Sequence, residues 1–576
     1  MSTEYQNILS PQDYLHDSEL QEAFELINGN AIEKTIIDIA RETGAPLRDT
    51  PDGHERYVVD RLALSPNEFR TRISLTELMK RVGLAVHDYP LGIIGQYDGQ
   101  DNSLSPVVIM SHFDAVPLGG MYDGVAGIAG AIELIRAFNM ADIRTLRSIV
   151  LLALTGEESS RFNIALFGSR GMFHGLTSEE LASKRPGDMS IQKALENAGY
   201  SIDTVMSPLF SPENVYATVE LHVDQTGLLE AQDTDLAIVE SIASPDRREI
   251  IIGAGGNNEQ QDYTYKHPLL IEINGRSGHS GATPMGKEFR LDGLVIAAEL
   301  LSHIDRLNQQ YHKKQLHTSI AVSFLDIEAQ SLNKIPGETA LAIQICGDDP
   351  KEIDQMLNDL NGFINRRNNY YARNNRHISP ISPFETEKQR PTTVPLVSSS
   401  INYTLAARIA LTVHSICNQQ KYRNAEVVGT VGTCSVSKDG HFILGLDVRG
   451  TDADLRNDAM AHILSNIAHI SRNLNVPYVT RQLPGSSLPV HLPSEVCSKA
   501  QKAIERHAIG SCIFTNSPAG HDTLNAASAD IPASLLFIPS ENGGIAHTPL
   551  EYTSPAALEK GAKAMAALVY ALANEK

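Results

Sequence analysis

The sequence predicts an α/β protein in which a sheet domain is interrupted by a long insertion. A chain of 576 residues is too long for one hydrophobic core, so two or more domains are expected. Short apolar runs are typical of buried parallel strands, and residues 125–138 have the spacing of a helix that follows the first run. The predicted strands are 106–110, 148–154, 215–219 and 533–538.

The middle of the chain has a different pattern. From about residue 266 it predicts strand, helix, strand, strand and helix, and from about residue 392 a similar order returns. We interpret this as an internal duplication of a ferredoxin-like half, with a proline-rich linker at 379–395. The predicted division is a main domain at 1–245 and 486–576, interrupted by copy one at 246–385 and copy two at 386–485.

Composition argues against several classes of function. The formal net charge of −21 argues against a nucleic-acid or anionic-membrane partner, because either would require a basic face. No apolar stretch reaches the roughly 18 residues of a membrane span, and the polar, acidic start lacks the features of a secretory signal. Five scattered cysteines fit a reducing compartment better than a disulfide framework. We therefore expect a cytoplasmic protein.

Five residues from separate segments predict a site for two divalent metal ions. They are His112, Asp123, Glu158, His222 and His547. Most of them lie at or just beyond the predicted end of a strand, where open α/β sheets place their sites. Two ions need imidazole or carboxylate ligands and one shared carboxylate, for which we choose Asp123. Such ions lower the pKa of bound water to about 7, which provides hydroxide at neutral pH.

Each of these residues also has an ordinary interpretation. A single histidine is usually only a polar side chain, Asp123 could cap the following helix, and Glu157 with Glu158 could be a solvated acidic pair. The combination favours the metal site. Asp114 could accept the second N–H of His112 and fix its tautomer. We expect Glu158 to bind metal and Glu157 to move a proton from water to the leaving nitrogen.

Longer segments around these residues resemble one family. They are SHFDAVPLGGMYDGVAGIAG, TGEESSRFNIALFGSRGMF, ELHVDQTGLLEA, GHSGATPMGKEFRLDG, LNKIPGE, AGHDT and GGIAHTPLEYTSPAAL. Their order is similar to that in the binuclear-zinc aminoacylase-like amidohydrolases, in the hydantoinase/carbamoylase branch. That branch contains N-carbamoyl-L-amino acid hydrolases, allantoate amidohydrolases and β-ureidopropionases. The resemblance implies a mixed-sheet, zinc-exopeptidase-like catalytic domain with an inserted ferredoxin-like lid domain, here duplicated.

The resemblance also implies cofactors and substrate contacts. The cofactors would be two divalent ions, Zn²⁺ in the first place, with Mn²⁺, Co²⁺ or Ni²⁺ as alternatives. His279 resembles a lid histidine that stabilises the developing oxyanion, although a turn histidine is its ordinary interpretation. Gln225 resembles a substrate-amide contact and Asn333 a carboxylate contact. His521 and Glu551 match substrate-site loop residues near the second metal.

One departure concerns the arginine that binds the substrate carboxylate in the family. Its expected position beyond Asn333 is Cys346, and the Asp-x-Arg sequence occurs in copy two instead, ending at Arg449. In dimeric relatives the partner chain supplies the lid histidine and asparagine, whereas the arginine comes from the chain's own lid. We therefore expect copy one to act as a built-in partner lid in a monomer. The alternative is a homodimer in which copy two is only an insertion.

The predicted function is hydrolysis of a linear C–N amide bond in an N-carbamoyl amino acid or an allantoate-like ureido acid. Glu157 would be the general base for a metal-bridging hydroxide, and Arg449 would bind the carboxylate of the small-molecule substrate. A dipeptidase or N-acyl-amino acid hydrolase of the same superfamily is the first alternative. A non-catalytic binding protein is the remote alternative; it predicts loss of a metal ligand or of the base, and all six residues are present.

Overall fold

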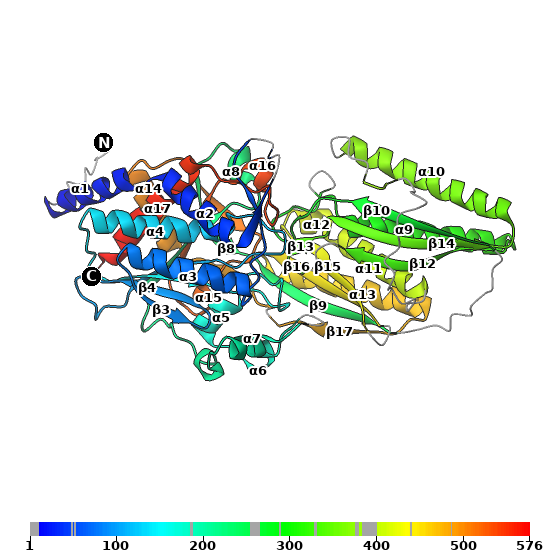
Figure 1. The fold of residues 1–576 in the computed structure, drawn as a ribbon, viewed down its shortest axis with the longest axis horizontal. Helices are drawn as coiled ribbons and strands as arrows, with labels where there is room; N and C mark the ends of the chain where they lie inside the picture. Colours follow the sequence, from blue (N-terminus) through cyan, green and yellow to red (C-terminus); the bar gives the residue numbers. More distant parts are fainter. Residues whose placement is uncertain are drawn as a thin grey trace, which may run out of the picture. The chain divides into compact units, whose positions relative to one another are not determined.

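The computed structural model describes most of the chain. The described residues are 11–47, 50, 53–184, 188–253, 265–286, 290–327, 331–374, 380–382, 400–437, 441–484 and 486–575. The chain divides into two units, and many of their elements are labelled in Figure 1. Unit 1 consists of Met1–Ile242, Val490–Ser517 and His521–Lys576, and unit 2 of Ala243–Pro489 and Pro518–Gly520.

Unit 1 is built on a mixed sheet of nine strands among its described residues. The order is β18-β8-β20-β7-β5-β6-β4-β3, with β19 beside β8. The strands are β3 (Ala85–Tyr89), β4 (Gly92–Tyr97), β5 (Val107–His112), β6 (Ile149–Leu154), β7 (Ala217–Val223), β8 (Leu236–Ile242), β18 (Val490–His491), β19 (Cys512–Ser517) and β20 (Ala533–Ile538). Because β20, β7, β5 and β6 are parallel neighbours, their carboxyl ends meet at one edge of the sheet.

The central strands are buried on both faces, as their continuous apolar sequences predict. Every residue of β5, β6, β7 and β20 is buried. Helices α2 (Gly29–Thr43), α4 (Val125–Met140) and α17 (Pro555–Ala573) pack on one another (Figure 1). Helices α4 and α17 also contact β5 and β7. Helices α5 (Phe167–His174) and α15 (Thr523–Ser528) also pack together, and α15 contacts β7 and β20. The main hydrophobic core thus surrounds the strands that carry the predicted metal ligands.

The remaining elements of unit 1 are mostly short. The helices are α1 (Pro11–Leu26), α3 (Pro66–Arg81), α6 (Ser178–Leu181), α7 (Ile191–Asn197), the 3-10 helix Ile202–Val205, α8 (Leu228–Ala231), α14 (Ser494–Arg506) and α16 (Glu541–Gly544). Strands β1 (Gly44–Pro46) and β2 (Tyr57–Val59) form a separate antiparallel pair. Within the described ranges, no helix has both the length and the hydrophobicity that crossing a bilayer requires.

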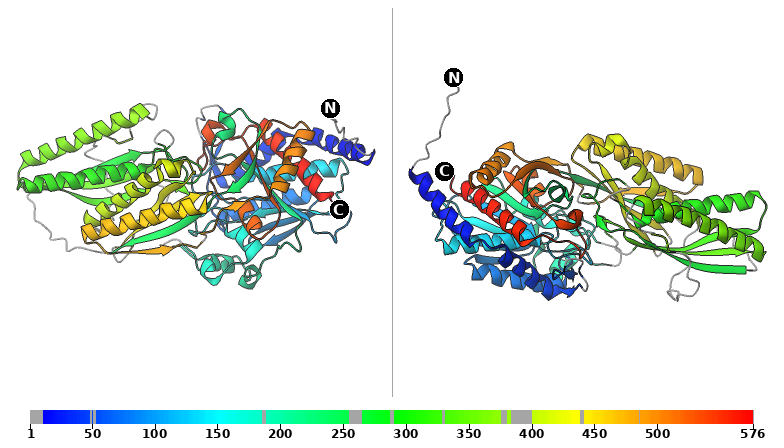
Figure 2. Two further views of the ribbon diagram at one scale, coloured as in Figure 1. Left: turned by 180° about the vertical axis from the view of Figure 1, so that it is seen from behind. Right: turned by 90° about the horizontal axis from the view of Figure 1, so that it is seen from above.

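Unit 2 contains two larger antiparallel sheets, each covered by two helices, which can be followed in Figures 1 and 2. The sheet β10-β14-β12 contacts α9 and α10, and the sheet β15-β16-β9-β17 contacts α11 and α13. The strands are β9 (Ser244–Ile252), β10 (Tyr265–Asn274), β12 (Thr318–Ile327), β14 (Glu338–Gly347), β15 (Val428–Val436), β16 (Phe442–Gly450) and β17 (Tyr478–Gln482). The helices are α9 (Gly293–Lys313), α10 (Pro350–Asn374), α11 (Ser400–Cys417) and α13 (Ala453–Leu474).

The two halves of unit 2 share one hydrophobic core, in which α9 packs against α11. Three shorter elements complete the unit: β11 (Gly278–His279) pairs with β13 (Lys334–Ile335), and α12 (Gln420–Arg423) follows α11.

Strand β9 differs from the predicted division of the chain. The division at 246 assigned most of its residues to copy one, but β9 lies between β16 and β17, which the same division assigned to copy two. The reason is side-chain burial in the shared core: Ile250 and Ile252 are fully buried and stand opposite Leu444 and Phe442 in the sheet.

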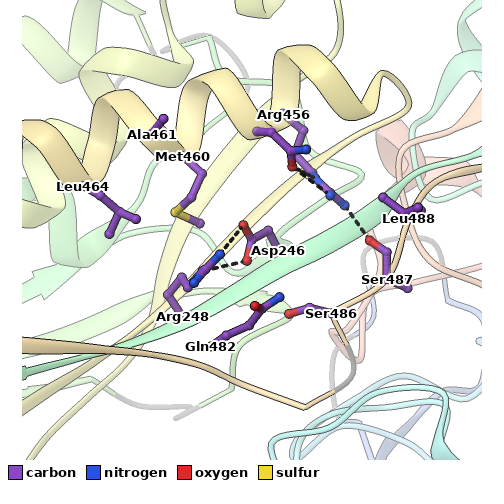
Figure 3. A pocket seen from close by; sticks show the side chains of 11 residues that line it. Asp246, Arg248, Arg456, Met460, Ala461, Leu464, Gln482, Ser486, Ser487 and Leu488 are labelled. Carbon is purple, nitrogen blue, oxygen red and sulfur yellow. Dashed lines mark hydrogen bonds and ion pairs between the residues drawn. The ribbon is translucent and has the colours of Figure 1, made fainter.

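A cavity of about 470 Å³ lies in unit 2 beside β9 and α13 (Figure 3). Its lining residues are Asp246, Arg248, Arg456, Asn457, Met460, Ala461, Leu464, Gln482, Ser486, Ser487 and Leu488. Asp246 and Arg248 point toward each other and form an ion pair of 2.8 Å. The lining contains no residue of the predicted site.

Candidate metal centre

The parallel strands of unit 1 bring the predicted ligands to one edge of the sheet. His112 is the last residue of β5, and His222 is the second-last residue of β7. Glu158 follows β6, and His547 lies in the loop after β20. These four strands are neighbours in the sheet, so segments that are distant in sequence converge there.

The first group of ligand atoms comes from His112, Asp123 and His222, which are all buried. The Nε2 of His222 is 3.1 Å from Oδ1 of Asp123 and 3.4 Å from Nε2 of His112. The Nε2 of His112 is 3.7 Å from the same Asp123 oxygen. Two imidazole nitrogens and one carboxylate oxygen thus lie close enough together to bind one metal ion.

The second group comes from Asp123, Glu158 and His547, also buried. The Nε2 of His547 is 3.2 Å from Oδ2 of Asp123 and 3.1 Å from Oε1 of Glu158. Asp123 therefore directs one oxygen to each group, which is the arrangement required of a shared carboxylate. The structure brings together all five predicted ligands.

The charges in this cluster fit a bound cation. Burial alone would raise the pKa of Asp123, but hydrogen bonds with His112, His222 and His547 hold that pKa well below its usual range. Burial lowers the pKa of His547, yet Glu158 and Asp123 raise it to about 10. Protons on the imidazoles thus balance the buried carboxylates, and divalent ions could replace them. Nitrogen and oxygen donors of this kind accept Zn²⁺, Mn²⁺, Co²⁺ or Ni²⁺.

The outer nitrogens of two histidines are held by backbone carbonyls. The Nδ1 of His222 is 3.0 Å from the carbonyl oxygen of Val223, and the Nδ1 of His112 is 3.1 Å from the carbonyl oxygen of Asp114. If each Nδ1–H donates to its carbonyl, Nε2 is left to bind metal.

The Asp114 carboxylate, predicted to orient His112, also contacts the turn after β6. It lies 3.7 Å from the His112 ring and accepts the backbone N–H groups of Glu157 and Glu158 at 3.1 and 3.2 Å. Asp114 thus fixes the turn that carries the two glutamates.

The adjacent Glu157 and Glu158 have different surroundings. Glu158 is buried next to His547, whereas Glu157 is only half-buried. Burial, and then the charge of Glu158, raise the pKa of Glu157 well above its usual value, which suits a proton acceptor. Gly156 makes the turn possible: its φ is 72°, and a Cβ there would lie 2.1 Å from the ring of Phe167.

Two further predicted residues contact Asp123. Gln225 donates its side-chain amide to both carboxylate oxygens, at 3.1 and 3.0 Å. Glu551, predicted as a substrate contact, accepts the backbone N–H groups of Tyr122 at 2.7 Å and Asp123 at 3.0 Å. No local pattern in the sequence could have predicted that contact, because these segments are hundreds of residues apart. His521 lies edge-on to His222, with 4.5 Å between the ring centroids.

The other predicted residues, His279, Asn333 and Arg449, lie in unit 2 and are buried. The backbone carbonyl of Asn333 accepts the N–H of Ser280, next to His279, at 2.9 Å. The Nη1 of Arg449 is 3.5 Å from Nε2 of His279. Residues from the two predicted copies are therefore neighbours within one unit.

The sequence pattern of peptidase family M20/M25/M40 matches residues 108–571, which include all five ligands and Glu157. The chain belongs to this family. Members of the M20 family depend on metal ions, in agreement with the two groups of ligand atoms.

Relatives in this family include named amidohydrolases. An N-carbamoyl-L-amino-acid amidohydrolase from Pseudomonas sp. is 32% identical over 256 residues, which are 43% of this chain and 55% of that protein. A ureidoglycolate hydrolase from Arabidopsis thaliana is 30% identical over 307 residues, which are 52% of this chain and 58% of that protein. The chain thus matches somewhat more than half the length of these relatives.

The fold is similar to a solved amidase of the hydantoinase/carbamoylase family from Burkholderia vietnamiensis. The TM-score is 0.57 at 20% identity, and the match covers 95% of this chain and 98% of the other. At that identity the likeness concerns the fold alone.

Proposed function

We propose that this chain is a metal-dependent amidohydrolase that cleaves a linear C–N bond in an N-carbamoyl amino acid or an allantoate-like ureido acid. The observation that carries the proposal is the sharing of Asp123 between two buried groups of ligand atoms, with the Glu157 carboxyl near enough to Glu158 and His112 to interact with their charges. The named amidohydrolase relatives support the substrate class.

Each residue of unit 1 has a proposed task. His112, His222, Glu158, His547 and the shared Asp123 would hold two divalent ions, of which Zn²⁺ is our first choice. Such ions would supply Lewis-acid activation of water and of the substrate carbonyl. Glu157 would take the proton from the attacking water and give it to the leaving nitrogen. An N-carbamoyl substrate would yield an amino acid, ammonia and carbon dioxide.

We propose that unit 2 is a duplicated ferredoxin-like lid with nested copies. The strand order β15-β16-β9-β17, with α11 and α13, corresponds to a complete ferredoxin-like βαββαβ unit whose first strand is β9. The order β10-β14-β12, with α9 and α10, corresponds to the first five elements of the same unit, inserted after β9, and Ile381 forms an antiparallel bridge with Ile273 of β10. Within this lid, Arg449 would bind the substrate carboxylate, and Asn333 would be a further carboxylate contact. His279 would stabilise negative charge on the carbonyl oxygen.

We also propose a cytoplasmic monomer. The nearness of His279 and Arg449 within one unit supports a substrate site completed by a single chain. The scattered cysteines, which form no disulfide among the described residues, support a reducing compartment.

The test is a parallel assay of N-carbamoyl amino acids, allantoate, N-acyl amino acids and dipeptides with added Zn²⁺, Mn²⁺ or Co²⁺. We expect ammonia release from the carbamoyl or ureido substrates. Preferred turnover of dipeptides or N-acyl amino acids would instead support the peptidase or acylase alternative, which the family name and the duplicated lid favour.

A further inference from the structure

Unit 2 contains a second buried arginine beside the predicted carboxylate-binding Arg449. Arg247 lies in β9, the strand that the sequence division assigned to copy one, and it stands directly opposite Asp447 of β16. Its Nε is 3.4 Å from Oδ2 of Asp447, and both side chains are fully buried. Burying an arginine is costly unless it is paired, so this position needs a specific explanation.

Asp447 also holds Arg449, two residues later in the same strand. The Nε of Arg449 is 3.0 Å from Oδ1 of Asp447, and its Nη2 is 2.9 Å from Oδ2. One edge of the guanidinium is thus fixed by Asp447, while Nη1 lies 3.5 Å from Nε2 of His279. The orientation of the Arg449 guanidinium, and with it the position of Nη1, therefore depends on the position of the Asp447 carboxylate.

We infer that Arg247 is a positioning residue that sets the preference for substrates with a carboxylate, acting through Asp447 on Arg449. This inference rests on the proposed function. Arg247 lies on the neighbouring strand and donates a hydrogen bond to the same Asp447 oxygen that accepts one from Nη2 of Arg449. Arg247 thus fixes the position of the Asp447 carboxylate and weakens the interaction of that carboxylate with Arg449. More of the positive charge of Arg449 then remains available for an anionic ligand. Without Arg247, the negative charge of Asp447, which already contacts Arg449 with both oxygens, would pair with Arg449 alone.

The experiment compares an N-carbamoyl amino acid with its uncharged C-terminal carboxamide. In each purified enzyme the ratio of the two kcat/KM values measures selectivity for the carboxylate, and this ratio does not depend on the fraction of folded enzyme. We expect Arg247→Met to lower the ratio about tenfold or more, mainly through a higher KM for the acid, because hydrogen bonds to charged groups are worth roughly that factor. Arg247→Lys, which keeps the charge, should recover part of the loss.

The matched control is Arg248→Met. Arg248 is the next residue of β9, but it pairs with Asp246 at the cavity of Figure 3 and not with Asp447. We expect its selectivity ratio to equal that of the unsubstituted enzyme. If Arg247→Met does not fold, Arg247→Gln, which keeps an amide donor, should show the same direction of change.

The results distinguish a wrong role for Arg247 from a wrong proposed function. A selectivity ratio that Arg247→Met and Arg247→Gln leave within about twofold of the unsubstituted enzyme overturns the inference, as does an equal loss for both substrates. An unsubstituted enzyme that hydrolyses no carbamoyl or ureido acid overturns the proposed function, and the inference with it.

Discussion

Glu551 accepts a hydrogen bond from the backbone N–H of Asp123 at 3.0 Å, although 428 residues separate them in the sequence. The same oxygen accepts the N–H of Tyr122. Asp123, which belongs to both groups of candidate ligand atoms, is thus held in place from the carboxy-terminal loop. That loop also contains His547, so one segment supplies a candidate ligand and fixes the position of another.

Glu551→Ala should therefore weaken metal binding. We expect the affinity for Zn²⁺ to fall about 10- to 100-fold, the usual effect of removing a group that orients a metal ligand. The measurement is a Zn²⁺ titration of enzyme first stripped with a chelator. Glu551→Gln is the matched control, because its amide oxygen can still accept the two backbone hydrogen bonds. Equal Zn²⁺ affinities for all three proteins would contradict this role.

The two groups of ligand atoms predict different effects of single substitutions on metal content. His222 belongs to the first group only, whereas Asp123 belongs to both. We expect about two ions per unsubstituted chain, about one after His222→Ala, and fewer than one after Asp123→Ala. Elemental analysis of gel-filtered protein measures this directly. Chelation should abolish turnover and added metal should restore it; turnover that survives complete chelation would refute a metal-dependent reaction.

Glu157→Gln should separate proton transfer from metal binding. Glu157 is adjacent to a predicted ligand but belongs to neither group of ligand atoms. We expect kcat to fall by about 10²- to 10⁴-fold, since the amide cannot accept a proton, while the metal content stays unchanged. Steady-state kinetics and elemental analysis on the same preparation give both quantities. A variant that keeps its kcat would exclude Glu157 as the base.

The buried carboxyl of Glu68 should make the free energy of unfolding depend on pH. Burial raises the pKa of this carboxyl to about 7, against the opposing charge of Arg72. The folded chain therefore holds a proton that the unfolded chain releases above pH 4.5, and the free energy of unfolding falls as the pH rises from 4.5 to about 7.

Glu68→Gln removes this titration. Between pH 5 and pH 8, the stability of the unsubstituted chain relative to this variant should decrease by roughly 2 to 3 kcal/mol. Unfolding by urea at the two pH values measures the difference. A constant difference would show that Glu68 is ionised in the folded chain.

The association state of the active enzyme tests the proposal that a single chain completes the substrate site through unit 2. Because His279 and Arg449 already lie together in one chain, we expect an active monomer of 62.8 kDa. Light scattering during turnover at low protein concentration measures this. Activity that requires a dimer would favour the alternative in which copy two is only an insertion.

The sequence alone predicted the four central strands of unit 1 and the five residues that form the two groups of candidate ligand atoms. A strand that is buried on both faces is apolar along its whole length, so a continuous apolar run predicts it. Histidine and acidic residues, the types that bind metal, lie close to the ends of these runs in the sequence. The shared role of Asp123 was also predicted, since two ions require one carboxylate between them.

Only the tertiary structure decided which atoms meet. Strand pairing placed β9 beside β16 and so brought Arg247 to Asp447, and chain closure brought Glu551 to the backbone of Asp123. It also turned the Asp114 carboxylate toward two backbone amides. Such contacts depend on sheet order and on side-chain direction, which are set by packing across the whole core and leave no periodic pattern in the sequence.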